Sequence, residues 1–144
     1  MVISLALPFL AGLVGSLATG SAIAGWYTTL TKPEFNPPNW VFAPVWTTLY
    51  LMMGIALYRV WRRGHSPILF IAHLVVNALW SIVFFGLHSP ALGLAVILIL
   101  LAMIVVITRR FWRVDRLAGY LLVPYLAWVA FVAVLNASIW WLNG

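Results

Sequence analysis

Residues 90–109 read PALGLAVILILLAMIVVITR, and this stretch decides the fold class. It contains no charged side chain before its last residue, and about 20 apolar residues suffice to cross ~30 Å of hydrocarbon as a helix. The whole chain of 144 residues has the same character, with 65% hydrophobic residues, 7% charged residues and a mean hydropathy of +1.09. A soluble domain carries about 25% charged residues. The chain cannot furnish a water-facing surface of that kind, so we expect an integral membrane protein.

Four further apolar blocks have a similar length. The five predicted spans are residues 5–25, 41–62, 66–87, 90–109 and 117–142, each boundary being approximate. Their residues do not alternate between polar and apolar as the strands of a membrane barrel do. The sequence therefore predicts an all-α membrane protein. It is expected to form a single domain over residues 1–144, a bundle of five transmembrane helices with a long structured loop, 26–40, between the first two.

The first block has a competing interpretation. Ala22-Ile23-Ala24 after an apolar stretch looks like a signal-peptidase site, but no Lys or Arg precedes Lys32 to supply the charged start of a signal peptide. We therefore favour a retained helix. A small residue recurs in it every four positions, which allows another helix to approach closely: Gly12, Ser16, Gly20 and Ala24.

The charges are distributed unevenly along the chain. Two acids, Glu34 and Asp115, stand against eight Lys and Arg residues. Seven of the eight flank or fill two connections that five spans would place on one side: Arg59, Arg62, Arg63, Arg109, Arg110, Arg113 and Arg116. The positive-inside rule predicts that this side is cytoplasmic, with the N-terminus inside and the C-terminus outside. A site for anionic lipid or another ligand is the alternative interpretation of these arginines.

Two further classes are excluded by composition. The arginines sit between apolar blocks and are not interleaved with polar residues, so we expect no nucleic-acid partner. The chain has no cysteine, which excludes disulfides, thiolate metal sites and thiol catalysis. We expect no metal and no obligatory cofactor.

A bacterial cell membrane is the expected location, with an outer membrane as the alternative.

Polar and aromatic side chains form a stripe at helical spacing in three of the predicted spans. The stripes are Trp46, Tyr50 and Gly54; His73, Asn77, Trp80 or Ser81, and Phe84; and Pro124, Trp128, Val132 and Asn136. A buried amide or indole N–H in lipid needs a partner, so these faces are predicted to point into the bundle. They form either a packed interior or a ligand cavity.

The few ionisable groups within the predicted spans limit which classes of membrane protein the chain can belong to. None of the predicted spans has Asp, Glu, Lys or Arg in its middle, and His73 is the ionisable side chain there. Ion-coupled transporters usually need buried carboxylates, whereas an apolar, aromatic-walled cavity suits a flat, hydrophobic ligand. His73 is a packing residue or, less favoured, a ligand of haem iron.

The 26–40 loop contains three prolines, Pro33, Pro37 and Pro38, which prevent a regular helix through its middle. Four aromatic residues distinguish it from a disordered linker. We expect it to pack on the bundle above Trp46 as a lid; a rigid connector without a ligand role is the alternative.

Several of these motifs together resemble the translocator protein family, also called TspO/MBR, tryptophan-rich sensory protein or peripheral-type benzodiazepine receptor. The motifs are Trp26-Tyr27, Lys32-Pro33-Glu34-Phe35-Asn36-Pro37-Pro38, Trp46, Tyr50, Asn77-Ala78-Leu79-Trp80-Ser81, Phe84-Phe85-Gly86, Pro124-Tyr125-Leu126-Ala127-Trp128 and Leu135-Asn136. They cover nearly the whole chain in order, and the short termini suggest a bacterial member.

The resemblance implies a five-helix bundle, commonly a homodimer in membrane lipid, that binds porphyrins such as protoporphyrin IX or haem-type tetrapyrroles, and other hydrophobic small molecules. A role in tetrapyrrole regulation or stress response would follow. Carried over by position, the ligand site would comprise Tyr27, Pro37, Trp40, Trp46, Tyr50, Asn77, Trp80, Phe84, Trp128 and Val132.

The resemblance leaves two alternatives open. One is a light- and oxygen-dependent porphyrin-degrading enzyme that uses Trp46 and Trp128; no conventional catalytic constellation is present, so an enzyme is not the favoured interpretation. The other is a sterol or lipid transporter. Ala137 and Trp141 stand where the sterol motif of animal members has tyrosine and arginine. Val132, often alanine in the family, is expected to narrow the pocket.

Overall fold

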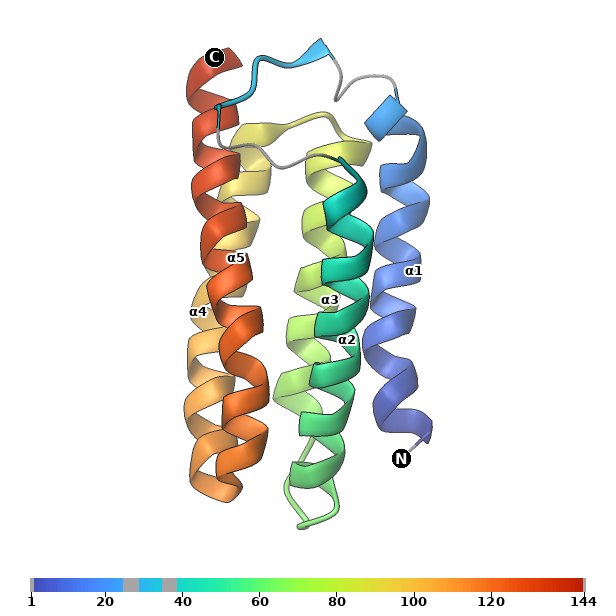
Figure 1. Ribbon diagram of the computed structural model, residues 1–144, viewed down its shortest axis with the longest axis vertical. Coiled ribbons are helices and arrows are strands. Elements are labelled where there is room, and N and C mark those ends of the chain that lie inside the picture. The colour runs from blue at the N-terminus through green and yellow to red at the C-terminus, as the bar shows by residue number, and fades with distance from the viewer. Residues whose placement is uncertain (1, 25–28, 35–38, 144) are drawn as a thin grey trace.

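The computed structural model describes residues 2–24, 29–34 and 39–143, and within them the side chains other than those of 16–24, 39–40 and 42–43. The described residues form five α-helices and one π-helical segment, and none of them is in a β-strand (Figure 1). The elements are α1 (Val2–Ala24), α2 (Asn39–Trp61), α3 (Ile68–Ser81), η2 (Ile82–Gly86), α4 (Pro90–Val114) and α5 (Arg116–Asn143). The predicted all-α class is confirmed.

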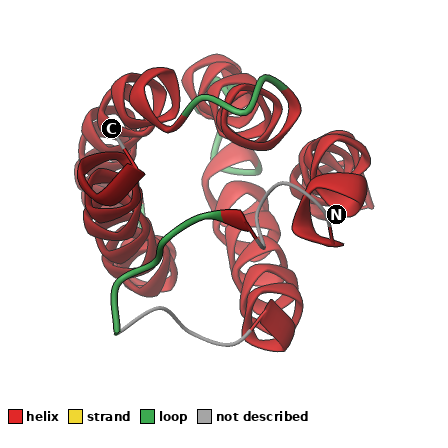
Figure 2. Ribbon diagram, turned by 90° about the horizontal axis from the view of Figure 1, so that it is seen from above, coloured by secondary structure: helices red, strands yellow, loops and turns green. Residues whose placement is uncertain are grey.

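The helices are arranged as a closed ring. α1 packs against α2 and α3, α2 packs against α5, α5 against α4, and α4 against α3. Figure 2 looks down the bundle and shows the helices around this ring. The faces that point into the ring carry the buried side chains, which are apolar with few exceptions. Residues far apart in sequence on α2, α3 and α5 are thereby brought together.

Three helical stretches of the described chain are long and apolar enough to cross a membrane. They are Ile68–Gly86, Pro90–Val114 and Arg116–Asn143, with mean hydropathies of 2.3, 3.1 and 2.0. Their outward faces expose large apolar side chains such as Leu98, Val106 and Val134. The part of α1 whose side chains are described, Val2–Gly15, is a shorter apolar helix. An integral membrane protein is therefore supported, while the count of five spans stays a prediction.

Local sequence explains where the helices of the second half begin. Pro90 occupies the first turn of α4, where its missing N–H costs nothing, and the Ser89 side chain caps the helix by accepting a hydrogen bond from Leu92 N at 3.2 Å. Asp115 caps α5 in the same way, accepting from Leu117 N at 3.0 Å. It has extended backbone angles, φ −155° and ψ 115°, and is the one residue between α4 and α5.

Two sequence expectations about these boundaries are corrected. The fourth helix was expected to end at Arg109, with Arg110 and Arg113 in a connection, but α4 continues to Val114. Arginine is a good helix former, so loss of hydropathy at Arg109 ends the apolar stretch and not the helix. The third span was expected as one helix over 66–87; it is α3 followed by the π-helical segment η2.

Small residues bring α1 close to its neighbours, as the sequence predicts for Gly12. A Cβ atom added at Gly12 would lie 2.5 Å from the Tyr50 ring, and one added at Gly54 would lie 2.8 Å from the Leu5 Cα atom. The predicted stripe continues with Ser16, Gly20 and Ala24, whose side chains lie outside the described residues.

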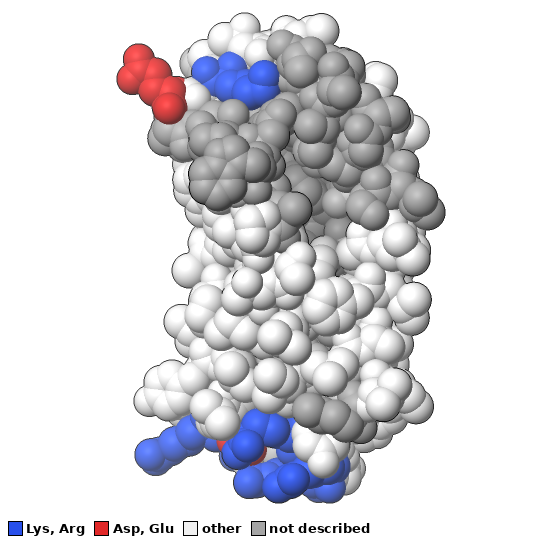
Figure 3. Space-filling model, turned by 45° about the vertical axis from the view of Figure 1, so that its right-hand side comes forward, with Lys and Arg blue, Asp and Glu red and all other residues white. Residues whose placement is uncertain are grey.

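Charge separates the two ends of the molecule. In Figure 3, Arg side chains gather at the end where α2 ends and α4 meets α5, Lys32 lies with Glu34 at the opposite end, and the described surface between the ends on this face is uncharged. Glu34 lies at the opposite end, where the described loop segment 29–34 passes over the bundle. That segment is fastened to α5: Asn143 Nδ2 donates to Thr31 O at 2.8 Å, and Thr31 N donates to Asn143 Oδ1 at 2.9 Å.

Candidate ligand site

Aromatic rings from α2 and α5 meet inside the ring of helices. The Trp46 ring stacks on Tyr50 with centroids 5.5 Å apart and meets Trp128 edge-on at 6.4 Å. It also meets Tyr125 edge-on at 6.3 Å. We refer to Trp46, Tyr50, Tyr125 and Trp128 as the aromatic cluster. Tyr125 is buried, whereas both tryptophans are partly exposed. The cluster is therefore anchored on its interior side and accessible on the other.

A chain of hydrogen bonds fixes the interior side of the cluster. His73 Nδ1 lies 2.7 Å from the Phe70 carbonyl oxygen, which only accepts, so Nδ1 carries the hydrogen. His73 Nε2 then accepts from the Tyr125 hydroxyl at 2.9 Å. The Tyr125 oxygen accepts from Asn77 Nδ2 at 2.9 Å, and Asn77 Oδ1 accepts from the Tyr50 hydroxyl at 3.5 Å. The chain joins the buried side chains of α3 and α5 to the half-buried Tyr50 of α2.

The same contacts decide between the two interpretations of His73. Both ring nitrogens are engaged within the protein, and the side chain is 1% exposed. The geometry favours a packing residue that orients Tyr125 over a ligand of haem iron.

A second polar contact holds Trp80. Its Nε1 donates to Asn136 Oδ1 at 3.0 Å, and Asn136 Nδ2 donates to the Pro90 carbonyl oxygen at 2.8 Å. The Trp80 ring stacks on Phe84 with centroids 5.4 Å apart. Next to these rings lies a hollow of about 20 Å³, which we call the Trp80 hollow. Its lining consists of Trp80, Phe84, Phe85, Val132, Leu135, Asn136 and Ile139.

The structure divides the sequence-predicted site residues into three sets. Trp46, Tyr50 and Trp128 belong to the aromatic cluster, and Asn77 is bonded to it. Trp80, Phe84 and Val132 line the Trp80 hollow. Tyr27 and Pro37, and the side chain of Trp40, lie outside the described residues.

One predicted stripe is corrected at its start. Pro124 was expected to face inward, but it is exposed, and Tyr125 takes the inward position. The buried row of α5 runs through Ala118, Leu122, Tyr125, Val129, Val132 and Asn136. This row alternates steps of three and four residues, whereas the predicted stripe counted back from Trp128 by four. The i, i+3, i+4 pattern was the signal that could have found Tyr125.

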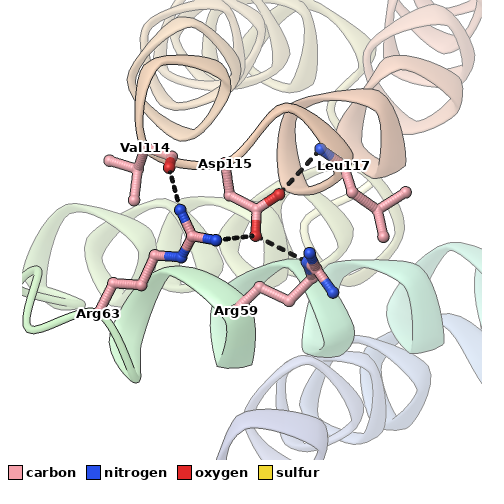
Figure 4. A network of polar contacts seen from close by, with 5 residues as sticks. All are labelled: Arg59, Arg63, Val114, Asp115 and Leu117. Atoms are coloured by element: carbon pink, nitrogen blue, oxygen red, sulfur yellow. Dashed lines mark hydrogen bonds and ion pairs between the residues drawn. The ribbon is translucent and has the colours of Figure 1, made fainter.

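At the arginine-rich end, one carboxylate joins three helices. Asp115 Oδ2 accepts from Arg59 Nε at 2.8 Å and lies 3.6 Å from an Arg63 nitrogen (Figure 4). Arg63 also donates to the Val114 carbonyl oxygen at 2.7 Å. The hydrogen bond from Arg59 holds the pKa of Asp115 below its ordinary value of 3.8. The carboxylate thus ties the end of α2 to the α4–α5 corner.

Comparison with known proteins agrees with these motifs. The model of the TspO/MBR family matches residues 4–142. The chain is 45% identical over 139 residues to the tryptophan-rich protein TspO of Chlorobaculum tepidum, covering 92% of this chain and 88% of that protein. It is 37% identical over 145 residues to the tryptophan-rich sensory protein of Cereibacter sphaeroides, with 97% and 92% covered. It is 36% identical over 141 residues to the human translocator protein, with 92% and 83% covered.

Proposed function

The chain belongs to the TspO/MBR family, and on that premise we propose that it is a membrane receptor or carrier for porphyrins and other flat, hydrophobic ligands. The ligand would bind at the aromatic cluster and extend toward the Trp80 hollow. Such a protein would act in tetrapyrrole regulation or in a stress response. The ligand would be bound by contact with aromatic faces and by a few hydrogen bonds.

The observation that carries this proposal is the meeting of Trp46 and Trp128 at 6.4 Å from two different helices. Indole faces bind the face of another aromatic ring well, and an aromatic pair contributes about 0.5–1.5 kcal/mol beyond its buried area. The polar groups of Tyr50 and Asn77 lie directly beside these rings. A planar macrocycle with polar edge groups matches that combination.

Binding requires the aromatic rings to separate. Pockets for drug-sized ligands have volumes of roughly 300–1,000 Å³, whereas the Trp80 hollow has about 20 Å³. Separating Trp46 from Trp128 costs about 1 kcal/mol of ring contact. Transfer of roughly 300 Å² of apolar ligand surface out of water returns about 7.5 kcal/mol at about 25 cal/mol per Å². The balance favours a site that opens as the ligand enters.

The test is a protoporphyrin titration of the detergent-solubilised protein, followed by the porphyrin absorption band. This readout does not depend on the tryptophans that are replaced. We expect saturable binding that is weakened at least about tenfold by Trp46→Ala and by Trp128→Ala, since each removes a large aromatic contact. Trp141→Ala is the matched control, because Trp141 is on α5 and is 83% exposed. Equal affinities for all four proteins would reject this site.

The orientation in the membrane is a separate part of the proposal. The seven arginines at one end would face the cytoplasm. Because the chain has no cysteine, single cysteines at exposed Ser66 and Leu142 can report on the two ends. We expect a membrane-impermeant thiol reagent applied to intact cells to label Leu142→Cys and to leave Ser66→Cys unlabelled until the cells are opened. The reverse pattern would invert the orientation.

The homodimer implied by the family is also proposed. It is tested by the mass of the purified protein in detergent, after the contribution of the bound detergent has been subtracted. A mass of one chain, 16.1 kDa, at all protein concentrations would contradict it.

A further inference from the structure

The arginine-rich end has far more positive than negative charge. Of the two acids in the chain, Glu34 is at the opposite end and Asp115 is held by Arg59 and Arg63. The sequence therefore supplies no carboxylate at this end for the remaining arginines, which are Arg62, Arg109, Arg110, Arg113 and Arg116. Their counter-ions must come from outside the chain.

Two of these arginines border an open hollow on the outer side of α4. Arg109 and Arg113 are four residues apart, as are Thr108 and Trp112, so the two pairs form neighbouring rows on the helix surface. These four residues line a hollow of about 300 Å³. The Thr108 hydroxyl is buried and has no hydrogen-bond partner among the described residues. This hydroxyl is not accessible from the hollow, so the groups that the hollow offers to a ligand are the two arginines and the indole of Trp112.

The side chain of Trp112, which lines the hollow, is held in place by contacts with α5. The Trp112 ring meets Tyr120 edge-on with centroids 4.3 Å apart. A Cβ atom added at Gly119 would lie 2.7 Å from the Trp112 ring, so the glycine lets the indole lie against the backbone of α5. Trp112 remains 38% exposed. An indole held half-exposed beside arginines is typical of the boundary between hydrocarbon and headgroups.

An apolar stripe leads along α4 to the two arginines. Ala95, Leu98, Ala102 and Val106 are exposed and recur at steps of three and four residues, in line with Arg109. Leu98 is 52% exposed and Val106 is 44% exposed. From Leu98 to Arg109 the helix rises roughly 16 Å, which is about the depth of one leaflet of hydrocarbon. The stripe would contact an acyl chain whose headgroup lies at the arginines.

We propose that this face of α4 binds one anionic phospholipid of the phosphatidylglycerol class. The phosphodiester lies between Arg109 and Arg113, the glycerol lies beside Trp112, and one acyl chain follows the stripe toward Leu98. Arginine suits the phosphate because its planar guanidinium donates two parallel hydrogen bonds. The apolar stripe favours a lipid over a free phosphate ion. The site is separate from the aromatic cluster and does not depend on the proposed porphyrin function.

The experiment measures retained lipid by native mass spectrometry of the full-length protein in detergent. Phosphatidylglycerol is titrated with phosphatidylcholine of the same chain length as the reference. The test variant is Arg109→Gln/Arg113→Gln, and the matched control is Arg110→Gln/Arg116→Gln, which removes the same charge from exposed arginines outside the hollow. At about 1 kcal/mol per arginine near a membrane surface, we expect about a 30-fold weaker affinity for phosphatidylglycerol in the test variant and less than about a threefold change in the control.

Three results would overturn the proposal. Equal losses in the two double variants would mean diffuse attraction of anionic lipid to the whole end. Unchanged binding in the test variant would mean that the lipid lies elsewhere. Displacement of the lipid by an equal concentration of glycerophosphoglycerol, the headgroup without acyl chains, would mean a site for a free phosphodiester. The far-UV circular dichroism of each variant, compared with that of the wild type, shows that the helices are intact.

Discussion

The Tyr125 hydroxyl is the central oxygen of the hydrogen-bond chain, and Tyr125→Phe removes it while keeping the ring. The change leaves His73 Nε2 without its donor and Asn77 Nδ2 without its acceptor. These two side chains are 1% and 5% exposed, so water cannot replace the lost oxygen. The ring contact with Trp46 is retained. The substitution therefore isolates two hydrogen bonds between α3 and α5.

The expected cost follows from these two bonds. A single hydrogen bond between membrane helices contributes on average about 0.6 kcal/mol and at most about 1.7. An unsatisfied buried group in a soluble protein costs about 1–3 kcal/mol. Two bonds in the dense interior of this bundle give an expected loss of about 2 kcal/mol in the free energy of unfolding.

The assay is unfolding by sodium dodecyl sulfate in mixed micelles, followed by far-UV circular dichroism. Tyr120→Phe on the same helix is the matched control, because the Tyr120 side chain is 57% exposed. Surface substitutions of this kind usually change stability by less than about 0.5 kcal/mol. If Tyr125→Phe lost no more than Tyr120→Phe, the hydrogen-bond chain would not stabilise the bundle and the reasoning would be refuted.

Two further predictions concern the helix contacts. Asp115→Asn keeps a good cap for α5 but removes the charge that faces Arg59 and Arg63, so unfolding should become easier by about 1 kcal/mol at pH 7. Since the folded pKa of Asp115 is lowered, its stabilisation is complete above about pH 5 and is lost as the pH falls from the unfolded pKa through the folded pKa. The difference between wild type and variant should shrink over that range, and a constant difference down to pH 2 would contradict this origin. Gly54→Ala places a Cβ atom 2.8 Å from the Leu5 backbone and should cost about 1–3 kcal/mol in the same unfolding assay; a neutral result would mean that α1 can move away from α2 without loss.

The class of the protein could be predicted from composition because lipid imposes a strong constraint. Residues 90–109 are apolar throughout until the final arginine, and few structures other than a membrane helix bury such a run. The inward stripes on α2 and α3 were also predictable, since indole and amide groups need partners away from lipid. Asn77 and Trp80 each have such a partner.

The features that could not be predicted depend on contacts between helices. The i, i+3, i+4 pattern allows Tyr125 as an inward residue of α5, but the contacts of Tyr125 with α2 and α3 decide that this row is buried while Pro124 is exposed. The end of α4 was misjudged because hydropathy reports the boundary of the hydrocarbon, whereas Asp115 sets the boundary of the helix. The lining of the Trp80 hollow by residues of η2 and α5 is likewise a product of packing.

The one-residue corner at Asp115 has a mechanical consequence. A connection of one residue keeps the adjoining ends of α4 and α5 close together, and the ion pairs of Asp115 with Arg59 and Arg63 fasten α2 to the same corner. At the opposite end, the crossing segment is tied to α5 by the paired hydrogen bonds of Thr31 and Asn143. The bundle is thus held by the Asp115 ion pairs at the arginine-rich end and by two backbone–side-chain hydrogen bonds at the opposite end. A ligand that entered at this opposite end would have to break the two Thr31–Asn143 hydrogen bonds. These bonds could re-form afterwards while the Asp115 ion pairs stayed intact.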